Sequence, residues 1–175
     1  AQAHFIKKNK KYLGNFGHIG TFSFYPGKNL GAMGDAGAII TNNKRLRNLC
    51  IMHLRHGGQR KHEHLLEGLN SRLDGLQAAI LNIKLRKIDT WNKKREIIAK
   101  EYLKNLSNLS AIKLPISNIK RNAHGFHQFV IKAKKRDELR KFLYSKKINT
   151  LIHYPKILPF VPAYKYQKNK KKRVS

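Results

Sequence analysis

The sequence predicts an α/β protein, and three of its features support this prediction. Short runs of β-branched and aromatic residues lie on both sides of a glycine-rich loop in GTFSFYPGKNLGAMGDAGAII, residues 20–40. Apolar residues then recur at helical spacing through much of residues 42–106. Between residues 126 and 155 the order strand, helix, strand is expected, which is typical of a small α/β unit.

The glycine-rich loop is expected to connect two short strands, residues 20–26 and 37–41. The next segment, NNKRLRNLCIMHLRHG, has apolar residues at positions 46, 49, 50, 52 and 54. A helix is therefore predicted there, and Gly57 and Gly58 are expected to end it. The polar segment that follows, residues 58–70, is expected to be a loop.

A long helical passage is predicted from Arg72 onward. The apolar positions 73, 76, 80, 83, 85 and 88 indicate an amphipathic helix. A second helix is expected over about 90–106, with a bend near Asp89 and Thr90.

The C-terminal part is expected to alternate between strands and a helix. IKLP (112–115), FHQFVIKA (126–133) and NTLIHYP (149–155) are predicted strands. KRDELRKFLYSKKI (135–148) is a predicted helix, because its apolar residues at 139, 142 and 143 share a face. Little regular structure is expected beyond Ala163.

The formal net charge of +29 raises the alternative of a basic module that binds nucleic acid or an anionic surface. The lysines are spread through nearly every segment, and only KYQKNKKKRVS at the end forms a basic block. Such blocks are usually solvated tails. No zinc-finger, aromatic RNP or helix-turn-helix pattern is present, so nucleic-acid binding is the less favoured function class.

Composition limits the remaining classes of function and cellular location. A hydrophobic content of 41% predicts a folded chain, and no apolar run approaches the ~18–20 residues that span a bilayer. The single cysteine, Cys50, is expected to pack in the core, and its isolation fits a cytoplasmic protein. The start, AQAHFIKKNK, has neither an initiator methionine nor a signal-peptide pattern, so the chain is expected to be a fragment.

Lys28 is the only lysine of the glycine-rich loop. The loop does not match a phosphate P-loop, because Asn29 follows Lys28 and Phe22 occupies the place of the first glycine. Ser23, five residues before Lys28, offers a hydroxyl that can hold a phosphate, and a partly desolvated lysine can form a Schiff base with an aldehyde. Pyridoxal phosphate contains both groups; a purely structural turn is the alternative that these residues leave open.

Seven segments, in this order, resemble the DegT/DnrJ/EryC1/StrS family of nucleotide-sugar aminotransferases. They are AQAH, SFYPGKNLGAMGDAGAI, LRHGG, GLNSRLDGLQAAIL, KLRKIDTWNKKREIIAKEYL, HGFHQFVI and LIHYP. The resemblance runs from residue 1 to about 164 and implies an aspartate aminotransferase-like fold (fold type I). It also implies pyridoxal 5'-phosphate as cofactor and a homodimer.

The resemblance further implies transfer of an amino group, typically from glutamate, to a keto sugar nucleotide in deoxyaminosugar and surface polysaccharide biosynthesis. The sequences of the motifs are most similar to those of enzymes that act on dTDP-3-keto-6-deoxyhexoses. Enzymes of UDP- or GDP-linked 4-keto sugars are the second choice.

Site residues follow from the resemblance position by position. Lys28 matches the lysine that binds the cofactor aldehyde and moves the proton, and Ser23 matches the serine that bonds the cofactor phosphate. Gln2 matches a glutamine that contacts the cofactor near its ring. Asn70 matches an asparagine that reaches the phosphate of the partner subunit, although it can also cap the following helix.

His153 and Tyr25 are the candidates for the substrate side, and a structural role for His153 is about equally expected. Gln77 and Arg72 are interpreted as packing and ion-pair residues. No metal site is expected, because the other histidines lack matched acidic ligands (His4, His18, His53, His56, His62, His64, His124 and His127).

The match to the family is incomplete at both ends. The acidic residue that the family places three positions before the equivalent of Gln2 would precede residue 1, so this chain alone is expected to have little or no activity. The expected domains are the end of the large cofactor domain (1–70), a helical connector (71–108) and a small α/β domain (109–162). A basic tail (163–175) is expected to follow.

Overall fold

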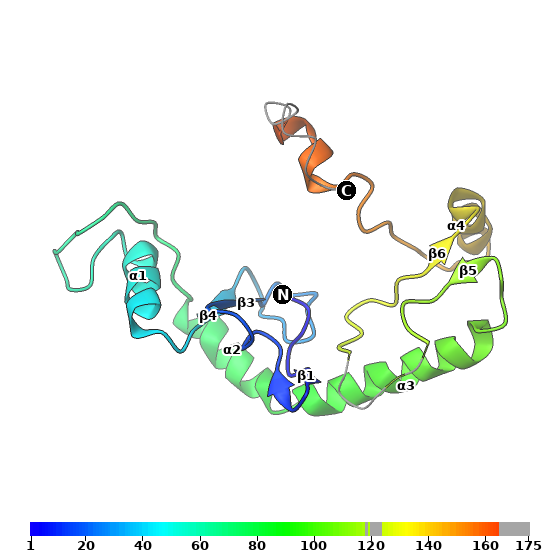
Figure 1. Cartoon of the computed structure of the whole chain (residues 1–175), viewed down its shortest axis with the longest axis horizontal. Coiled ribbons are helices and arrows are strands. Elements are labelled where there is room, and N and C mark those ends of the chain that lie inside the picture. Colours follow the sequence, from blue (N-terminus) through cyan, green and yellow to red (C-terminus); the bar gives the residue numbers. More distant parts are fainter. Residues whose placement is uncertain (118, 120–123, 165–175) are drawn as a thin grey trace. The chain divides into compact units, whose positions relative to one another are not determined.

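The computed structural model describes residues 1–117, 119 and 124–164 (Figure 1). The chain divides into two compact units, Ala1–Lys132 and Ala133–Ser175. The domain boundaries expected from the sequence stay a prediction.

The first unit begins with two antiparallel hairpins. Strands β1 (Lys7–Lys8) and β2 (Lys11–Tyr12) pair through a turn in which Asn9 and Lys10 have positive φ, the backbone that tight hairpins favour. The sequence did not predict this hairpin, because its lysine-rich strands show no alternation of apolar and polar residues.

Strands β3 (Gly20–Ser23) and β4 (Gly37–Ile40) flank the glycine-rich loop, as predicted, with Gly20 opposite Ile40 and Ser23 opposite Gly37. The first strand ends at Ser23, three residues earlier than predicted. One further backbone bond, from Phe24 N–H to the Ala36 carbonyl at 2.8 Å, extends the pairing into the loop.

Helix α1 (Lys44–Leu54) confirms the predicted helix and its glycine stop. Asn43 caps its N-terminus, with Oδ1 accepting from the Leu46 N–H at 3.1 Å. Beyond the last turn, Gly57 has φ +88° and its N–H donates to the Met52 carbonyl at 2.8 Å. This geometry is typical of a helix that ends at a glycine in the left-handed conformation. The expected loop over 58–70 contains no helix or strand, apart from one bridge between Arg55 and Asn70.

Helices α2 (Gly75–Leu85) and α3 (Ile88–Leu106) form the predicted helical passage (Figure 1). The break lies at Arg86 and Lys87, slightly before the predicted bend at Asp89 and Thr90. Asp89 is instead in the first turn of α3, where a carboxylate interacts favourably with the free N–H groups of the helix.

The core of the first unit lies between this helical passage and the glycine-rich loop. Its buried cluster consists of Leu30 and Ala32 from the loop with Leu81 and Ile88 from the helices. Phe24, Ala36 and Trp91 pack against this cluster, so the loop that carries Lys28 is part of the core. Cys50, expected in the core, is only half-buried.

The predicted strands at 112–115 and 126–133 are formed only in part, as β5 (Ile112–Lys113) and β6 (Lys132–Ala133), which pair. Ring packing explains the difference. Phe126 is buried with φ 40°, and the Phe129 ring stacks on Tyr102 of α3 at 4.8 Å between centroids, so this segment cannot remain a regular strand.

In the second unit, helix α4 (Arg136–Ser145) confirms the predicted helix. The predicted strand over 149–155 is wrong, because within the described residues no segment pairs with it and a strand needs a neighbour to satisfy its backbone. A short 3₁₀ helix, η1 (Leu158–Phe160), follows. The expectation of little order beyond Ala163 falls outside the described residues from 165 onward. Among the described helices, none has the length and apolar character needed to cross a membrane.

Candidate active site

The loop that carries Lys28 is closed by backbone bonds. The Lys28 N–H donates to the Tyr25 carbonyl at 2.9 Å, and the Ala32 N–H donates to the Phe24 carbonyl at 2.7 Å. Gly31 approaches the Pro26 carbonyl so closely that a Cβ atom at this position would collide with it. The loop therefore has one tight conformation, and Lys28 is half-buried in it.

Ser23 lies at the end of β3, directly before this loop. Its Oγ accepts a hydrogen bond from the Tyr25 N–H at 3.3 Å. Because a hydroxyl both accepts and donates, its hydrogen can still be given to an anion.

His4 lies close to Ser23 and Lys28. It is 1% exposed, and its ring stacks on Phe24 at 5.6 Å and lies 5.8 Å from the Phe22 ring. Burial lowers the pKa of His4; the Ser23 backbone opposes this shift, whereas the positive charges of the N-terminus, His127 and Lys28 add to it. These contacts place the N-terminal segment beside β3 and Lys28.

Gln2, on the same segment, is exposed and lies against Gly125, where a Cβ atom would come within 2.9 Å of the Gln2 carbonyl oxygen. The His127 ring nitrogen Nε2 lies 2.9 Å from the Gly27 carbonyl oxygen. Gln2, Ser23 and Lys28 thus belong to one neighbourhood, which residues 125–127 also border.

Polar side chains of the helical passage hold the loop from the other side. Gln77 Oε1 accepts from the Met33 N–H at 2.8 Å, and Lys84 Nζ donates to the Gly31 carbonyl at 2.6 Å. Asn92 Oδ1 accepts from Asn29 Nδ2 at 2.9 Å. Gln77 therefore has a structural role, as interpreted from the sequence, whereas Asn29 and Asn92 were not identified.

Asn70 lies elsewhere in the first unit. It is exposed, and its Oδ1 accepts from Arg72 Nε at 3.0 Å. Its partners belong to the connection between α1 and α2, not to the Lys28 loop, and a role toward a partner subunit stays a prediction. Asp74, rather than Asn70, occupies the position before α2.

The two substrate-side candidates are both exposed. Tyr25 is 59% exposed on the loop. His153 lies in the second unit, with its ring edge-on to Tyr154 at 5.3 Å between centroids. Their roles also stay predictions.

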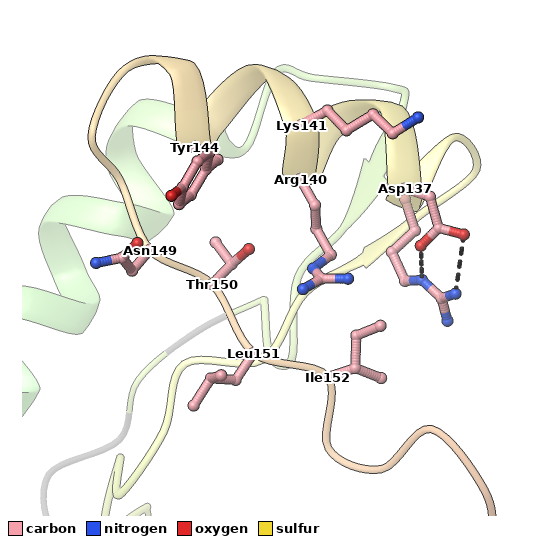
Figure 2. A pocket seen from close by; sticks show the side chains of 9 residues that line it. Asp137, Arg140, Lys141, Tyr144, Asn149, Thr150, Leu151 and Ile152 are labelled. Carbon is pink, nitrogen blue, oxygen red and sulfur yellow. Dashed lines mark hydrogen bonds and ion pairs between the residues drawn. The ribbon is translucent and has the colours of Figure 1, made fainter.

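The second unit has an open hollow of about 730 Å³ (Figure 2). Arg140 and Tyr144 project from α4 toward the segment 149–152 on its other side. The hydrogen-bonded Arg136 guanidinium, 2.8 Å from Asp137, lowers the pKa of that carboxyl. None of the predicted site residues lines this hollow, and the described residues contain no group of three side chains that could hold a metal ion.

The Lys28 neighbourhood therefore combines a primary amine on a fixed loop with a hydroxyl donor at the end of β3, and the backbone of Gln2 borders it. The Lys28 amine adds positive charge. A ligand that bears both an anionic group and an aldehyde matches this set of donors.

Comparison with known proteins gives a consistent result. The family model described as the DegT/DnrJ/EryC1/StrS aminotransferase family matches residues 1–175. The chain is 41% identical over 164 residues to the dTDP-3-amino-3,4,6-trideoxy-alpha-D-glucose transaminase of Streptomyces venezuelae. That alignment covers 94% of this chain and 43% of the relative, so the chain spans less than half the length of the curated protein it matches.

Solved structures agree with the sequence match. The crystal structure of S. venezuelae DesV superimposes with a TM-score of 0.86 at 41% identity, covering 94% of this chain and 44% of that one. The structure of NtdA from Bacillus subtilis with bound cofactor PMP gives a TM-score of 0.78 at 31% identity, covering 93% and 39%. The predicted fold class, that of fold type I transferases, is thereby confirmed.

Proposed function

Because the chain belongs to the DegT/DnrJ/EryC1/StrS aminotransferase family, we propose that its Lys28 loop is part of the active site of a pyridoxal-phosphate aminotransferase. The observation that carries the proposal is the position of Ser23 and Lys28 around one tight turn. Ser23 ends β3 and Lys28 lies on the loop that follows, which is closed by backbone bonds and bordered by His4.

The donors of this loop fit pyridoxal phosphate. We assign the Ser23 hydroxyl, whose hydrogen is available for donation, to the cofactor phosphate, and the Lys28 amine to its aldehyde. Gln2 is assigned to the region of the ring. Positive charge from Lys28 favours the anionic phosphate in this place.

When bound, the cofactor supplies an electron sink for the charge that develops at a substrate carbon. In the proposed reaction the Lys28 amine would move the proton between the substrate carbon and the cofactor: it would take the proton from the amino donor as general base and give one to the acceptor carbon as general acid. The closed loop keeps this amine at a fixed position, which is what proton transfer between two atoms requires.

For the substrates, we propose glutamate as the amino donor and a dTDP-linked 3-keto-6-deoxyhexose as the acceptor. The supporting observation is the similarity to the S. venezuelae transaminase, whose name states a dTDP-3-amino sugar. Incubation of an enzyme of full family length that contains this chain with dTDP-, UDP- and GDP-linked keto sugars and glutamate tests this choice, with the amino sugar product detected by mass spectrometry. Preference for a UDP- or GDP-linked 4-keto sugar would contradict it.

The proposal includes a homodimer in the cytoplasm, with Asn70 directed to the site of the second subunit. Exposed apolar side chains on and before α2 support a partner: Leu73, Leu76 and Ile83 are 42%, 71% and 69% exposed. His153 and Tyr25 are proposed to face the sugar nucleotide. The division into segments 1–70, 71–108, 109–162 and 163–175 is proposed as the domain organisation.

Cofactor capture at Lys28 tests the core of the proposal. The chain is incubated with substoichiometric pyridoxal phosphate, treated with borohydride and mapped by peptide mass spectrometry. Lys28 is expected to carry most of the label, and Lys28→Arg is expected to lose it.

Lys44→Arg is the matched control, because Lys44 is an exposed lysine at the start of α1. It should leave the labelling of Lys28 unchanged. Labelling spread over the many exposed lysines, with no preference for Lys28, would overturn the assignment.

A further inference from the structure

We propose that Asn92 of α3 is a positioning residue for Lys28, acting through Asn29 and together with it forming an amide latch. This inference rests on the proposed function, because it concerns the amine that the function assigns to the cofactor aldehyde. The latch connects α3, the Lys28 loop and the N-terminal segment that carries Gln2.

The bonds of the latch are short, and each is buried or partly buried. Asn29, the residue after Lys28, is 3% exposed, and its Nδ2 donates to Asn92 Oδ1 at 2.9 Å and to the Gly125 carbonyl at 2.6 Å. Asn92 Nδ2 in turn donates to the His4 carbonyl at 3.0 Å. With Gly125 included, these bonds join four segments that are far apart in the sequence.

These partners leave each amide only one orientation. Both hydrogens of Asn29 Nδ2 point to oxygen acceptors, and a reversed amide would put its oxygen against two oxygens. Asn92 must direct its oxygen to Asn29 and its nitrogen to the His4 carbonyl. The latch therefore fixes the distance between the backbone of His4 and the residue beside Lys28.

The latch is the last of three contacts between the loop and the helical passage. The loop and the helices run antiparallel along these contacts. Gln77 contacts Met33, Lys84 contacts Gly31 and Asn92 contacts Asn29. Between them, Leu30 and Ala32 of the loop are buried with Leu81 and Ile88 of the helices. The loop is therefore held in register along one face of α2 and α3, and Asn92 holds the end nearest Lys28.

Loss of Asn92 would leave buried donors and acceptors without partners, which costs more than the bonds themselves contribute. One Asn29 hydrogen and the His4 carbonyl would be affected. The loop can relieve this cost by moving Asn29, and Lys28 would move with it. The amine would then be displaced from a cofactor whose phosphate is held by Ser23 on β3, which the latch does not contact.

Asn92→Leu tests the proposal, because leucine has the same number and branching of side-chain heavy atoms as asparagine but its side chain forms no hydrogen bonds. Asn105→Leu is the matched control: the same substitution at an exposed asparagine of the same helix. Two measurements are made on each variant: the rate of borohydride-trapped capture of pyridoxal phosphate at Lys28, as a function of cofactor concentration, and backbone hydrogen exchange without cofactor.

In Asn92→Leu the maximal capture rate at Lys28 is expected to fall roughly tenfold, with the half-saturating cofactor concentration little changed. The Lys28 and Ala32 amides, which close the loop, are expected to exchange faster without cofactor, while the amides of α1 keep their protection. Because the two asparagines act in one chain of bonds, Asn29→Leu combined with Asn92→Leu should be no slower than the slower single variant.

Each outcome has a definite meaning. Unchanged capture and exchange in Asn92→Leu, with normal labelling of Lys28, would overturn the latch and leave the proposed function intact. A parallel loss of protection in α1 would also overturn it, since this shows general destabilisation. Absence of Lys28 labelling in the unmodified chain would contradict the proposed function, whereas hydrogen exchange would still report on the latch.

Discussion

At the residue scale, the buried His4 side chain is held in one protonation state by its surroundings near Lys28. Its ring contacts the Phe22 ring of β3 and the Phe24 ring of the loop, and the charges that act on it are all positive: the N-terminus, His127 and Lys28. Within the described residues neither ring nitrogen has a hydrogen-bond partner of good geometry. A proton on this ring would therefore be both desolvated and repelled, so the folded protein favours neutral His4.

This environment predicts a pH dependence of stability. The pKa of His4 is lowered in the folded state, so the unfolded chain binds more protons as the pH falls below the ordinary histidine value of about 6.5. The free energy of unfolding should be at its full value above that pH and decrease as the pH falls toward the lowered pKa.

The comparison variant is His4→Phe, which keeps an aromatic ring in the stack and removes the titrating group. Urea unfolding at pH 7.5, 6.5, 5.5 and 5.0 should show a smaller decrease for this variant than for the natural chain. Part of the decrease should remain, since burial also lowers the pKa of His124. Equal decreases in both proteins would show that His4 makes no contribution.

At the scale of elements, the glycine-rich loop and helix α2 depend on glycine in opposite ways. Gly31 is pressed against the Pro26 carbonyl, whereas a Cβ atom at Gly75, the first residue of α2, would meet nothing within 4 Å. The same change, glycine to alanine, should therefore have opposite effects at the two positions.

Gly31→Ala is expected to lower the free energy of unfolding by about 2 kcal/mol or more, because the backbone must shift. Gly75→Ala should raise it by roughly 0.5–1 kcal/mol through helix propensity and a less flexible unfolded chain. Guanidinium unfolding of both variants measures these changes. A neutral Gly31→Ala variant would mean that the loop tolerates a wider turn.

Local patterns in the sequence were sufficient to predict some elements but not others. The end of α1 could be predicted because the apolar period stops where Gly57 and Gly58 begin. The strand predicted over 149–155 was wrong because the local sequence does not show whether a neighbouring strand lies beside it.

The same limit applies to the candidate site. Lys28 and Ser23 could be assigned to one loop, since both lie within six residues and flank a recognisable turn. Asn29 and Asn92 could not be paired, because 63 positions separate them and neither residue type indicates its partner. One local feature points to this contact: Asn92 is a polar residue on the face of α3 that otherwise packs against the loop.

At the scale of the whole molecule, large apolar side chains remain uncovered on α2. Leu76 and Ile83 are 71% and 69% exposed, seven residues apart and therefore on the same helical face. Apolar surface arranged in this way is typical of an interface, and the proposed function assigns it to a second copy of the chain.

Ile83→Asp is expected to shift the proposed dimer toward monomer, because a carboxylate would have to be buried in an apolar contact. The matched control is Asn82→Asp, which adds the same charge at the neighbouring exposed position of α2. Light scattering after size-exclusion chromatography measures both masses. Equal masses for the two variants would place the dimer contact elsewhere.

The antiparallel fit of the Lys28 loop along α2 and α3 has a consequence for changes in chain length. Between Asn29 and Met33, two kinds of residue alternate. Asn29, Gly31 and Met33 form hydrogen bonds with the helices, and Leu30 and Ala32 are buried against them. A one-residue insertion here would reverse that alternation and expose Leu30 and Ala32 together. A deletion would pull Lys28 away from Ser23 or Met33 away from Gln77. This short span is therefore intolerant of both insertions and deletions.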